Sequence, residues 1–313
     1  MKNLRELFRI AAVGLVMGAA EVVPGVSGGT IAFISGIYER LINAIRQFTP
    51  YLILRLKDEG LKSTWEKVDA TFLLVLFAGM GISILIFASA VSYMLHHEPI
   101  AIWSFFFGLV VVSALVVSQE LESFGIQTGL GIGIGVVIGV VITHLVPITL
   151  EPTPLMLFVG GSIAVCAWIL PGLSGSFILL LLGLYGFVIE AIKSLDLLNL
   201  AFLALGAAIG LVSFSKLLSR LFSRFRNDTL SVLLGFMLGS LAKLWPWKNT
   251  TSYQIKADGS QIPLIQEPVL PNIYSNLTGQ DAQIMTAIGC ALVGGALVLV
   301  LQKAARIYSG PES

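Results

Sequence analysis

Apolar residues form long stretches along this chain, and polar residues are collected between them. Six stretches are long enough to cross a bilayer as helices, since a span needs roughly 20 apolar residues. They cover residues 70–95, 100–118, 129–147, 199–218, 229–246 and 282–302. The pattern therefore predicts an all-α polytopic membrane protein.

Two further apolar stretches, 10–37 and 155–190, are interrupted by the motifs Pro24-Gly-Val-Ser-Gly-Gly29 and Pro171-Gly-Leu-Ser-Gly-Ser176. Proline lacks the backbone N–H that a helix needs and glycine loosens the chain, so each helix should break at its motif. The first arm of residues 10–37, up to Val23, is about 21 Å long as a helix, which passes the midplane without crossing the membrane. We therefore expect both stretches to form re-entrant helical hairpins.

Composition agrees with a lipid environment. Hydrophobic residues make up 56% of the chain and charged residues 12%, whereas soluble proteins carry about 25% charged residues. The net charge of +1 provides no basic face for nucleic acid. Cys166 and Cys290 lie in apolar stretches and should pack as small apolar side chains. The three histidines have no neighbouring cluster of metal ligands in the sequence, so we expect no metal site.

The basic residues predict the orientation, because cytoplasmic loops collect lysine and arginine. Basic residues precede the first hairpin, fill segment 41–67 and follow the spans that end near 218 and 302. We therefore expect both termini in the cytoplasm and 41–67 along the cytoplasmic surface. The polar segment 247–281 should be the one sizeable external loop. The turn at 119–128 fits less well, since it is expected inside and carries no basic residue.

The chain contains an internal repeat. Six residues of the first hairpin recur 147 positions later in the second: Pro24, Gly25, Ser27, Gly28, Gly36 and Tyr38. Each half, 1–147 and 148–313, is thus a hairpin followed by three spans. Since three crossings are an odd number, the second half should be inverted and the two hairpins should enter from opposite sides. Inverted repeats with broken helices are a transporter design, although a duplication could also serve stability alone.

The polar hairpin tips are the candidate binding site. A new helix should begin after each break, and its unpaired N–H groups and dipole favour an anion such as phosphate or carboxylate. The predicted substrate-binding residues at the tips are Ser27, Gly28, Gly29, Thr30, Ser174, Gly175 and Ser176. The alternative is that these small residues only allow close helix packing.

Three charged residues add to this hypothesis. Glu21 lies deep in the first apolar arm, where a carboxylate suggests proton coupling or a basic partner; it could instead cap a helix. Its counterpart in the repeat is Trp168. Arg40 and Lys216 could contact a phosphate on the cytoplasmic side, or could extend their charged ends to the membrane surface. Without a nucleotide-binding motif, we expect no cofactor and an energy source in a proton, sodium or substrate gradient.

The segments Glu21-Val-Val-Pro-Gly-Val-Ser-Gly-Gly-Thr30 and Leu170-Pro-Gly-Leu-Ser-Gly-Ser176 resemble the paired signature of the bacterial polyprenyl-phosphate transporter family. The resemblance covers essentially the whole chain. It implies a non-enzymatic protein of the bacterial cytoplasmic membrane that translocates undecaprenyl phosphate. This lipid carrier is left on the outer leaflet by cell-envelope synthesis and must return for reuse.

Two other functions would also use an anion site at the tips of broken helices. Undecaprenyl-pyrophosphate phosphatase also has re-entrant hairpins, with a Pro-Gly-x-Ser-Arg-Ser type of motif. Here Gly28 and Gly175 stand where that enzyme has arginine, so neither tip offers a guanidinium for a transferring phosphoryl group. Glu21 also lacks the neighbouring carboxylates of that family. A small-anion or organic-acid transporter is the third possibility, and the sequence predicts no particular oligomeric state.

Overall fold

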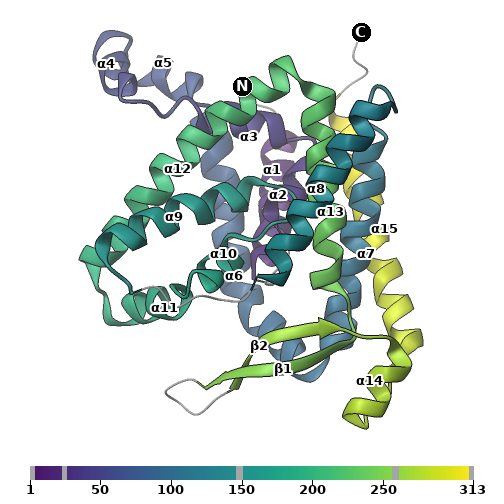
Figure 1. The fold of residues 1–313 in the computed structure, drawn as a ribbon. Helices are drawn as coiled ribbons and strands as arrows, with labels where there is room; N and C mark the ends of the chain where they lie inside the picture. Colours follow the sequence, from purple (N-terminus) through teal and green to yellow (C-terminus); the bar gives the residue numbers. More distant parts are fainter. Residues whose placement is uncertain (1–3, 23–26, 146–150, 256–260, 310–313) are drawn as a thin grey trace.

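The computed structural model describes residues 4–22, 27–145, 151–255 and 261–309, and most of them are helical (Figure 1). The six predicted spans form α6 (Ala70–His97), α7 (Pro99–Ser118), α8 (Ile126–His144), α12 (Leu197–Arg224), α13 (Arg226–Leu244) and α15 (Ile284–Ser309). Within the described residues, five of these helices are long and apolar enough to cross a membrane. The sixth, α13, carries polar residues such as Asp228 and Lys243 near its ends.

Both interrupted stretches break at their motifs, as predicted. The first forms α1 (Leu4–Glu21), α2 (Gly28–Ile34) and α3 (Tyr38–Ile45), and the second forms α9 (Pro154–Ile169), α10 (Gly175–Leu181) and α11 (Tyr185–Ser194). Pro24 and Gly25 themselves lie outside the described residues. Two residues after the end of each short helix stands a glycine, Gly36 or Gly183, with a φ of 70° that L side chains rarely adopt. The chain then turns sharply, by 106° between α10 and α11.

Helices pack in corresponding pairs. The first arm α1 packs along α6, and the second arm α9 packs along α12. A Cβ at Gly79 of α6 would lie 2.6 Å from the carbonyl oxygen of Ala11, and a Cβ at Gly206 of α12 would collide with that of Phe158. Gly206 follows Gly79 by 127 positions, and Phe158 follows Ala11 by 147. The two arms therefore approach their spans through corresponding residues.

The remaining spans pair between the two halves. The middle span of the first half, α7, packs along α15, which is the last span of the second half. Reciprocally, α13 packs along α8, the last span of the first half. Helices α7 and α13 also contact each other. The two halves are consequently interlocked rather than packed as separate bundles.

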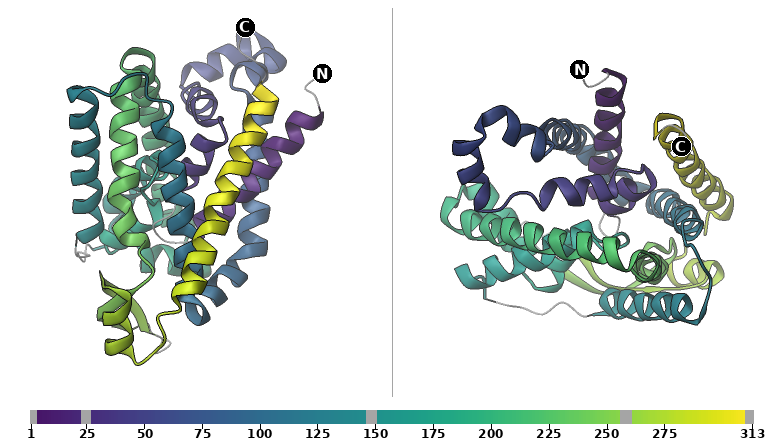
Figure 2. Two further views of the ribbon diagram at one scale, coloured as in Figure 1. Left: turned by 90° about the vertical axis from the view of Figure 1, so that its right-hand side faces the viewer. Right: turned by 90° about the horizontal axis from the view of Figure 1, so that it is seen from above.

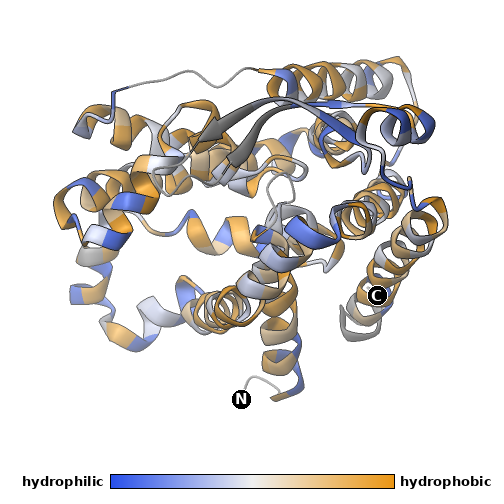
Figure 3. Ribbon diagram, turned by 90° about the horizontal axis from the view of Figure 1, so that it is seen from below, coloured by the Kyte–Doolittle hydropathy of each residue, from blue (hydrophilic) through white to orange (hydrophobic). Residues whose placement is uncertain are grey.

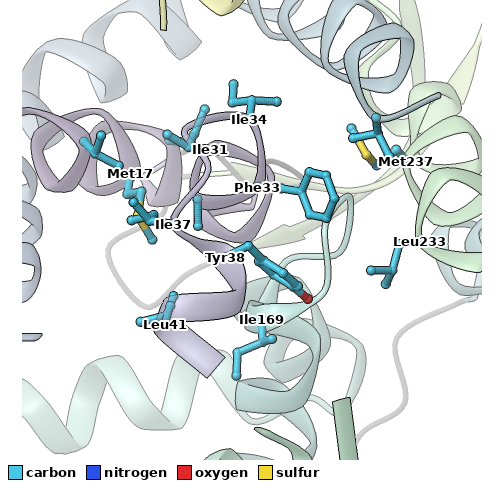
Figure 4. Packing of buried hydrophobic residues seen from close by; sticks show 14 of the residues in the cluster. Met17, Ile31, Phe33, Ile34, Ile37, Tyr38, Leu41, Ile169, Leu233 and Met237 are labelled. Carbon is cyan, nitrogen blue, oxygen red and sulfur yellow. The ribbon is translucent and has the colours of Figure 1, made fainter. Parts of the chain in front are cut away.

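Helix α2 lies at the centre of the molecule, and all seven of its residues are buried. Side chains from α1, α3, α9 and α13 surround it (Figure 4). Ile31 and Ile34 of α2 pack in this core together with Met17 of α1 and Met237 of α13. Most helices are apolar along much of their length (Figure 3), and large apolar side chains also face outward, with Leu85 and Ile126 more than 80% exposed. A protein that is apolar inside and outside matches lipid rather than water as its solvent.

Segment 247–281, expected as the one sizeable external loop, has secondary structure of its own, and its side of the membrane stays a prediction. It forms an antiparallel hairpin of β1 (Lys248–Ile255) and β2 (Gln261–Pro268), followed by α14 (Pro271–Thr278). The hairpin pairs Lys248 with Pro268, and the β-branched residues in it favour strand geometry. The indole N–H of Trp247 donates to the carbonyl oxygen of Ala282 at 2.8 Å, which anchors the hairpin to the start of the last helix.

The β-hairpin and α14 lie at the end of the molecule opposite both chain termini (Figures 1 and 2). Two short helices, α4 (Tyr51–Asp58) and α5 (Gly60–Lys67), project from the body at the end where the termini lie. Tyr51 and Leu61 are about 70% exposed there. The location of segment 41–67 along the cytoplasmic surface stays a prediction, and its first residues, such as Leu41 and Ile42, are buried in the core as part of α3.

Candidate functional site

The two hairpin tips touch each other near the centre of the fold. Ser27, the residue before α2, has its hydroxyl oxygen 3.0 Å from the carbonyl oxygen of Trp168 and 3.1 Å from that of Leu170. The same oxygen accepts a hydrogen bond from the backbone N–H of Gly29 at 3.0 Å. Ser27 is 1% exposed. One buried hydroxyl therefore caps α2 and bonds to the other hairpin.

Thr30 makes a second link between the tips. Its hydroxyl oxygen accepts a hydrogen bond from the backbone N–H of Gly172 at 3.1 Å. Gly172 has a φ of 86°, and a Cβ there would lie 2.8 Å from Cα of Met237. Because neither that backbone angle nor that space suits a side chain, only glycine fits this turn between Thr30 and α13.

The start of α2 also lies directly against the end of α9. A Cβ at Gly29 would collide with the carbonyl oxygen of Ile169. Because the obstacle is a backbone atom, it cannot move aside as the end of a flexible side chain could. The predicted residues Ser27, Gly29 and Thr30 are therefore brought together with the second motif in one interface.

The second tip has the same local design with weaker capping. The hydroxyl of Ser174 accepts from the backbone N–H of Phe177 at 3.4 Å, and it lies 2.9 Å from the hydroxyl of Ser176. Gly175 faces α9, because a Cβ there would lie 2.6 Å from the carbonyl oxygen of Ala164. Ser174 and Ser176 thus bond to each other and to their own helix start.

Glu21 occupies the place where the sequence predicted an anion. One carboxylate oxygen of Glu21 accepts a hydrogen bond of 2.6 Å from the backbone N–H of Gly28, the first residue of α2. The indole of Trp168 lies close to the same carboxylate, so Glu21 is next to its own counterpart in the repeat. Carboxylates at a helix N-terminus are stabilised by the unpaired N–H groups and the dipole. The first tip is consequently filled by a charge of the chain itself.

Arg40 lies away from the tips. Its guanidinium binds Glu6 of α1 at 2.7 Å and Asp69, the residue before α6, at 2.6 Å, and it stacks over the ring of Phe72. Arg40 thereby joins three elements at the end of the molecule that carries the termini. Its two carboxylate partners leave it little charge for a phosphate.

Lys216 is also distant from the tips and lines an open hollow between α3 and α12, together with Arg46, Gln47 and Arg220. In the sequence, Arg46 is one of several basic residues of segment 41–67, and none of its neighbours marks it as a ligand. Little in the sequence indicates that Arg46 could bind a ligand, because it follows α3 in a segment with many other charged residues. The structure therefore divides the predicted site residues between the central tips and the end where the termini lie.

The chain is similar to proteins of one named family. A family model described as undecaprenyl phosphate translocase-like matches residues 17–262, which include both Pro-Gly-x-Ser-Gly motifs. A polyprenyl-phosphate transporter of Vibrio cholerae is 46% identical over 293 residues, covering 94% of this chain and 95% of that protein. A polyprenyl-phosphate transporter of Staphylococcus aureus is 32% identical over 267 residues, covering 74% of this chain and 84% of its own. No solved structure matches the chain.

Proposed function

The chain belongs to the undecaprenyl phosphate translocase-like family, and on that premise we propose that it moves undecaprenyl phosphate across the bacterial cytoplasmic membrane. The relatives at 46% and 32% identity carry the name polyprenyl-phosphate transporter. Translocation returns the carrier lipid for reuse in cell-envelope synthesis. The protein performs this task without chemical change to the lipid.

The phosphate is held at the paired helix tips. The observation that carries this part of the proposal is the hydrogen bond of 2.6 Å between the Glu21 carboxylate and the N–H of Gly28. It supports an anion site at the start of α2, because an oxyanion already bonds there. A phosphate oxygen can take the same place once the carboxylate moves away. Glu21 then alternates with the substrate as the anion of the first tip.

Inverted topology gives both sides of the membrane access to the tips. The repeat itself is supported by the matched contacts of the two arms, Gly79 with Ala11 and Gly206 with Phe158, and its inversion follows from the odd number of spans in each half. The paired tips, bonded through Ser27 and Thr30, form the closed contact between the two hairpins. When these hydrogen bonds break, the two tips separate and the site opens. The end of the molecule that carries both termini faces the cytoplasm.

The glycines of the tips favour transport over hydrolysis. A side chain at Gly28 would place its Cβ 2.6 Å from the Glu21 carboxylate, and one at Gly175 would meet the backbone of α9. An arginine, which the phosphatase motif has at this position, does not fit at either tip without a rearrangement. The tips can hold a phosphate through N–H groups and hydroxyls, but they lack the guanidinium that stabilises phosphoryl transfer.

The test is surface labelling of undecaprenyl phosphate in living cells. Depletion of the protein should raise the amount of carrier on the outer leaflet, and re-expression of the wild-type chain should lower it again. The Gly29→Ala variant, whose added Cβ collides with Ile169, should fail to lower it. An outer-leaflet pool that does not change on depletion would contradict the proposal. Phosphate release from undecaprenyl pyrophosphate by the purified protein would instead favour the enzyme.

A further inference from the structure

A basic hollow lies at the end of the molecule where the two termini are found. It has a volume of about 260 Å³ and is lined by Arg46, Gln47, Lys216 and Arg220. Three of these four side chains are cationic, and none of the described residues that line the hollow is acidic. Three positive charges close together repel one another when no carboxylate lies between them. An anion bound among them removes this repulsion and is itself stabilised.

Arg46 is fixed in place and keeps an unused donor. One guanidinium N–H group donates to the hydroxyl of Ser219 at 2.6 Å, and that hydroxyl donates to the amide oxygen of Asn43 at 2.9 Å. The Nε of Arg46 is buried, and within the described part of the chain it has no hydrogen-bond partner. A buried donor without a partner costs free energy, which an oxyanion recovers when binding brings it within hydrogen-bond distance of Nε.

The acidic side chain that lines an adjoining hollow is already paired. A second hollow of about 200 Å³ adjoins the first through Arg46 and includes Glu39. The carboxylate of Glu39 forms an ion pair with Arg226 of α13. The charge of Glu39 is therefore neutralised by Arg226. It does not cancel the positive charge of the basic hollow.

We propose that the hollow lined by Arg46, Gln47, Lys216 and Arg220 is a separate docking site for the phosphate monoester headgroup of the transported lipid. This proposal rests on the proposed function. A phosphate monoester carries between one and a half and two negative charges near neutral pH and has three terminal oxygens. Three cations and an amide match it better than they match a phosphodiester lipid, which carries a single charge. Arginine adds a planar, bidentate donor pair for two of the oxygens.

The position of the hollow gives the site its role. It lies between α3, which follows the first hairpin, and α12, and apolar side chains such as Ile42 and Phe222 border the adjoining hollow. A headgroup bound there can keep its long tail in the lipid. The site receives the phosphate after it leaves the tips, or presents it to them, on the side of the membrane that the termini face.

Binding to the purified full chain in phosphatidylcholine nanodiscs tests the site. The probe is a labelled short-chain polyprenyl monophosphate, with phosphatidylglycerol and inorganic phosphate as competitors. Lys216→Gln and Arg220→Gln should each weaken binding of the probe about tenfold, since each removes one charge-assisted contact. Arg224→Gln is the matched control, because Arg224 lies one turn beyond Arg220 on α12 and stacks on Phe225 outside the hollow. Its affinity should equal that of the wild type.

The outcomes separate the docking site from the transport function. If the Lys216→Gln, Arg220→Gln double variant binds the probe as the wild type does, the docking site is wrong, while the function at the tips can still hold. If phosphatidylglycerol or inorganic phosphate competes as well as unlabelled polyprenyl monophosphate, the hollow is a general anion site and the proposal fails. If the wild type neither binds the probe nor translocates it, the proposed function itself fails. Size-exclusion elution of each variant checks that it is folded.

Discussion

The carboxylate of Glu21 bonds to the backbone N–H of Gly28 at 2.6 Å, so the first residue of α2 holds an anion that belongs to the same chain. The six residues that lie between Glu21 and Gly28 in the sequence include Pro24 and Gly25 of the motif. The break in the helix thus brings the end of α1 back to the start of α2. A substrate anion that reaches this tip must compete with Glu21.

Substitution of Glu21 by glutamine tests this competition. The amide oxygen can still accept from Gly28, but the charge that excludes a second anion is gone. We expect polyprenyl monophosphate to bind about two- to tenfold more tightly, which corresponds to the usual strength of a charge at a helix terminus. Translocation should slow, because the carboxylate no longer displaces the bound phosphate. Binding and translocation in reconstituted vesicles measure both effects.

The control for this variant is Glu190→Gln, which removes a carboxylate from the exposed face of α11. It should leave affinity and translocation unchanged. If Glu21→Gln also leaves both unchanged, Glu21 is a structural cap of α2 and takes no part in transport.

The two motif serines should differ in their contribution to stability. Ser27→Ala removes the cap of Gly29 and the bonds to the carbonyl oxygens of Trp168 and Leu170. The loss should be about 1–2 kcal/mol, as expected for a helix cap in a buried network. Ser174→Ala removes only a long cap of 3.4 Å and the contact with Ser176. Thermal unfolding in detergent should therefore give a lower Tm for Ser27→Ala than for Ser174→Ala, and equal values would contradict the asymmetry.

Contact between the tips depends on the absence of a side chain at position 29. In Gly29→Ala the added Cβ meets the carbonyl oxygen of Ile169, which the backbone of α9 holds in place. We expect destabilisation of about 1–3 kcal/mol, typical of an overpacked buried site, together with loss of translocation. Gly133→Ala is the control, since a Cβ at that position of α8 meets nothing within 4 Å. A Gly29→Ala protein with normal Tm and translocation would show that the tips do not need this close contact.

The sequence predicted the helices and their breaks better than it predicted which helices pack against each other. The breaks follow from local chemistry, because proline and glycine disrupt a helix wherever they stand in one. At an offset of 127 residues Gly206 is the counterpart of Gly79 in the sequence, and the two make corresponding contacts. The offsets could not reveal that α7 pairs with α15 and α13 with α8. That pairing depends on the long-range arrangement of the halves, and the last spans have little residue similarity.

Charged residues were the hardest to place from the sequence. Arg40 was a candidate phosphate ligand, yet its partners Glu6 and Asp69 are 34 and 29 positions away along the chain. Arg46 was not singled out, although it lies beside Lys216 in the folded protein. A basic residue in a cytoplasmic loop satisfies the orientation rule whether it binds a carboxylate, a lipid or water. Only the fold distinguishes these uses.

Arg40 and Lys216 should respond in opposite ways to loss of their charge. Arg40→Gln breaks both ion pairs and the stacking on Phe72, so it should lower stability. The side chain is 33% exposed, and solvent screening limits the loss to about 1 kcal/mol. Affinity for polyprenyl monophosphate should not change in Arg40→Gln, because its charge is already paired with two carboxylates. Lys216→Gln should show the reverse pattern, with weaker binding and an unchanged Tm. Thermal unfolding and binding measured on the same two preparations separate the roles, and weaker binding by Arg40→Gln at full stability would return Arg40 to the phosphate site.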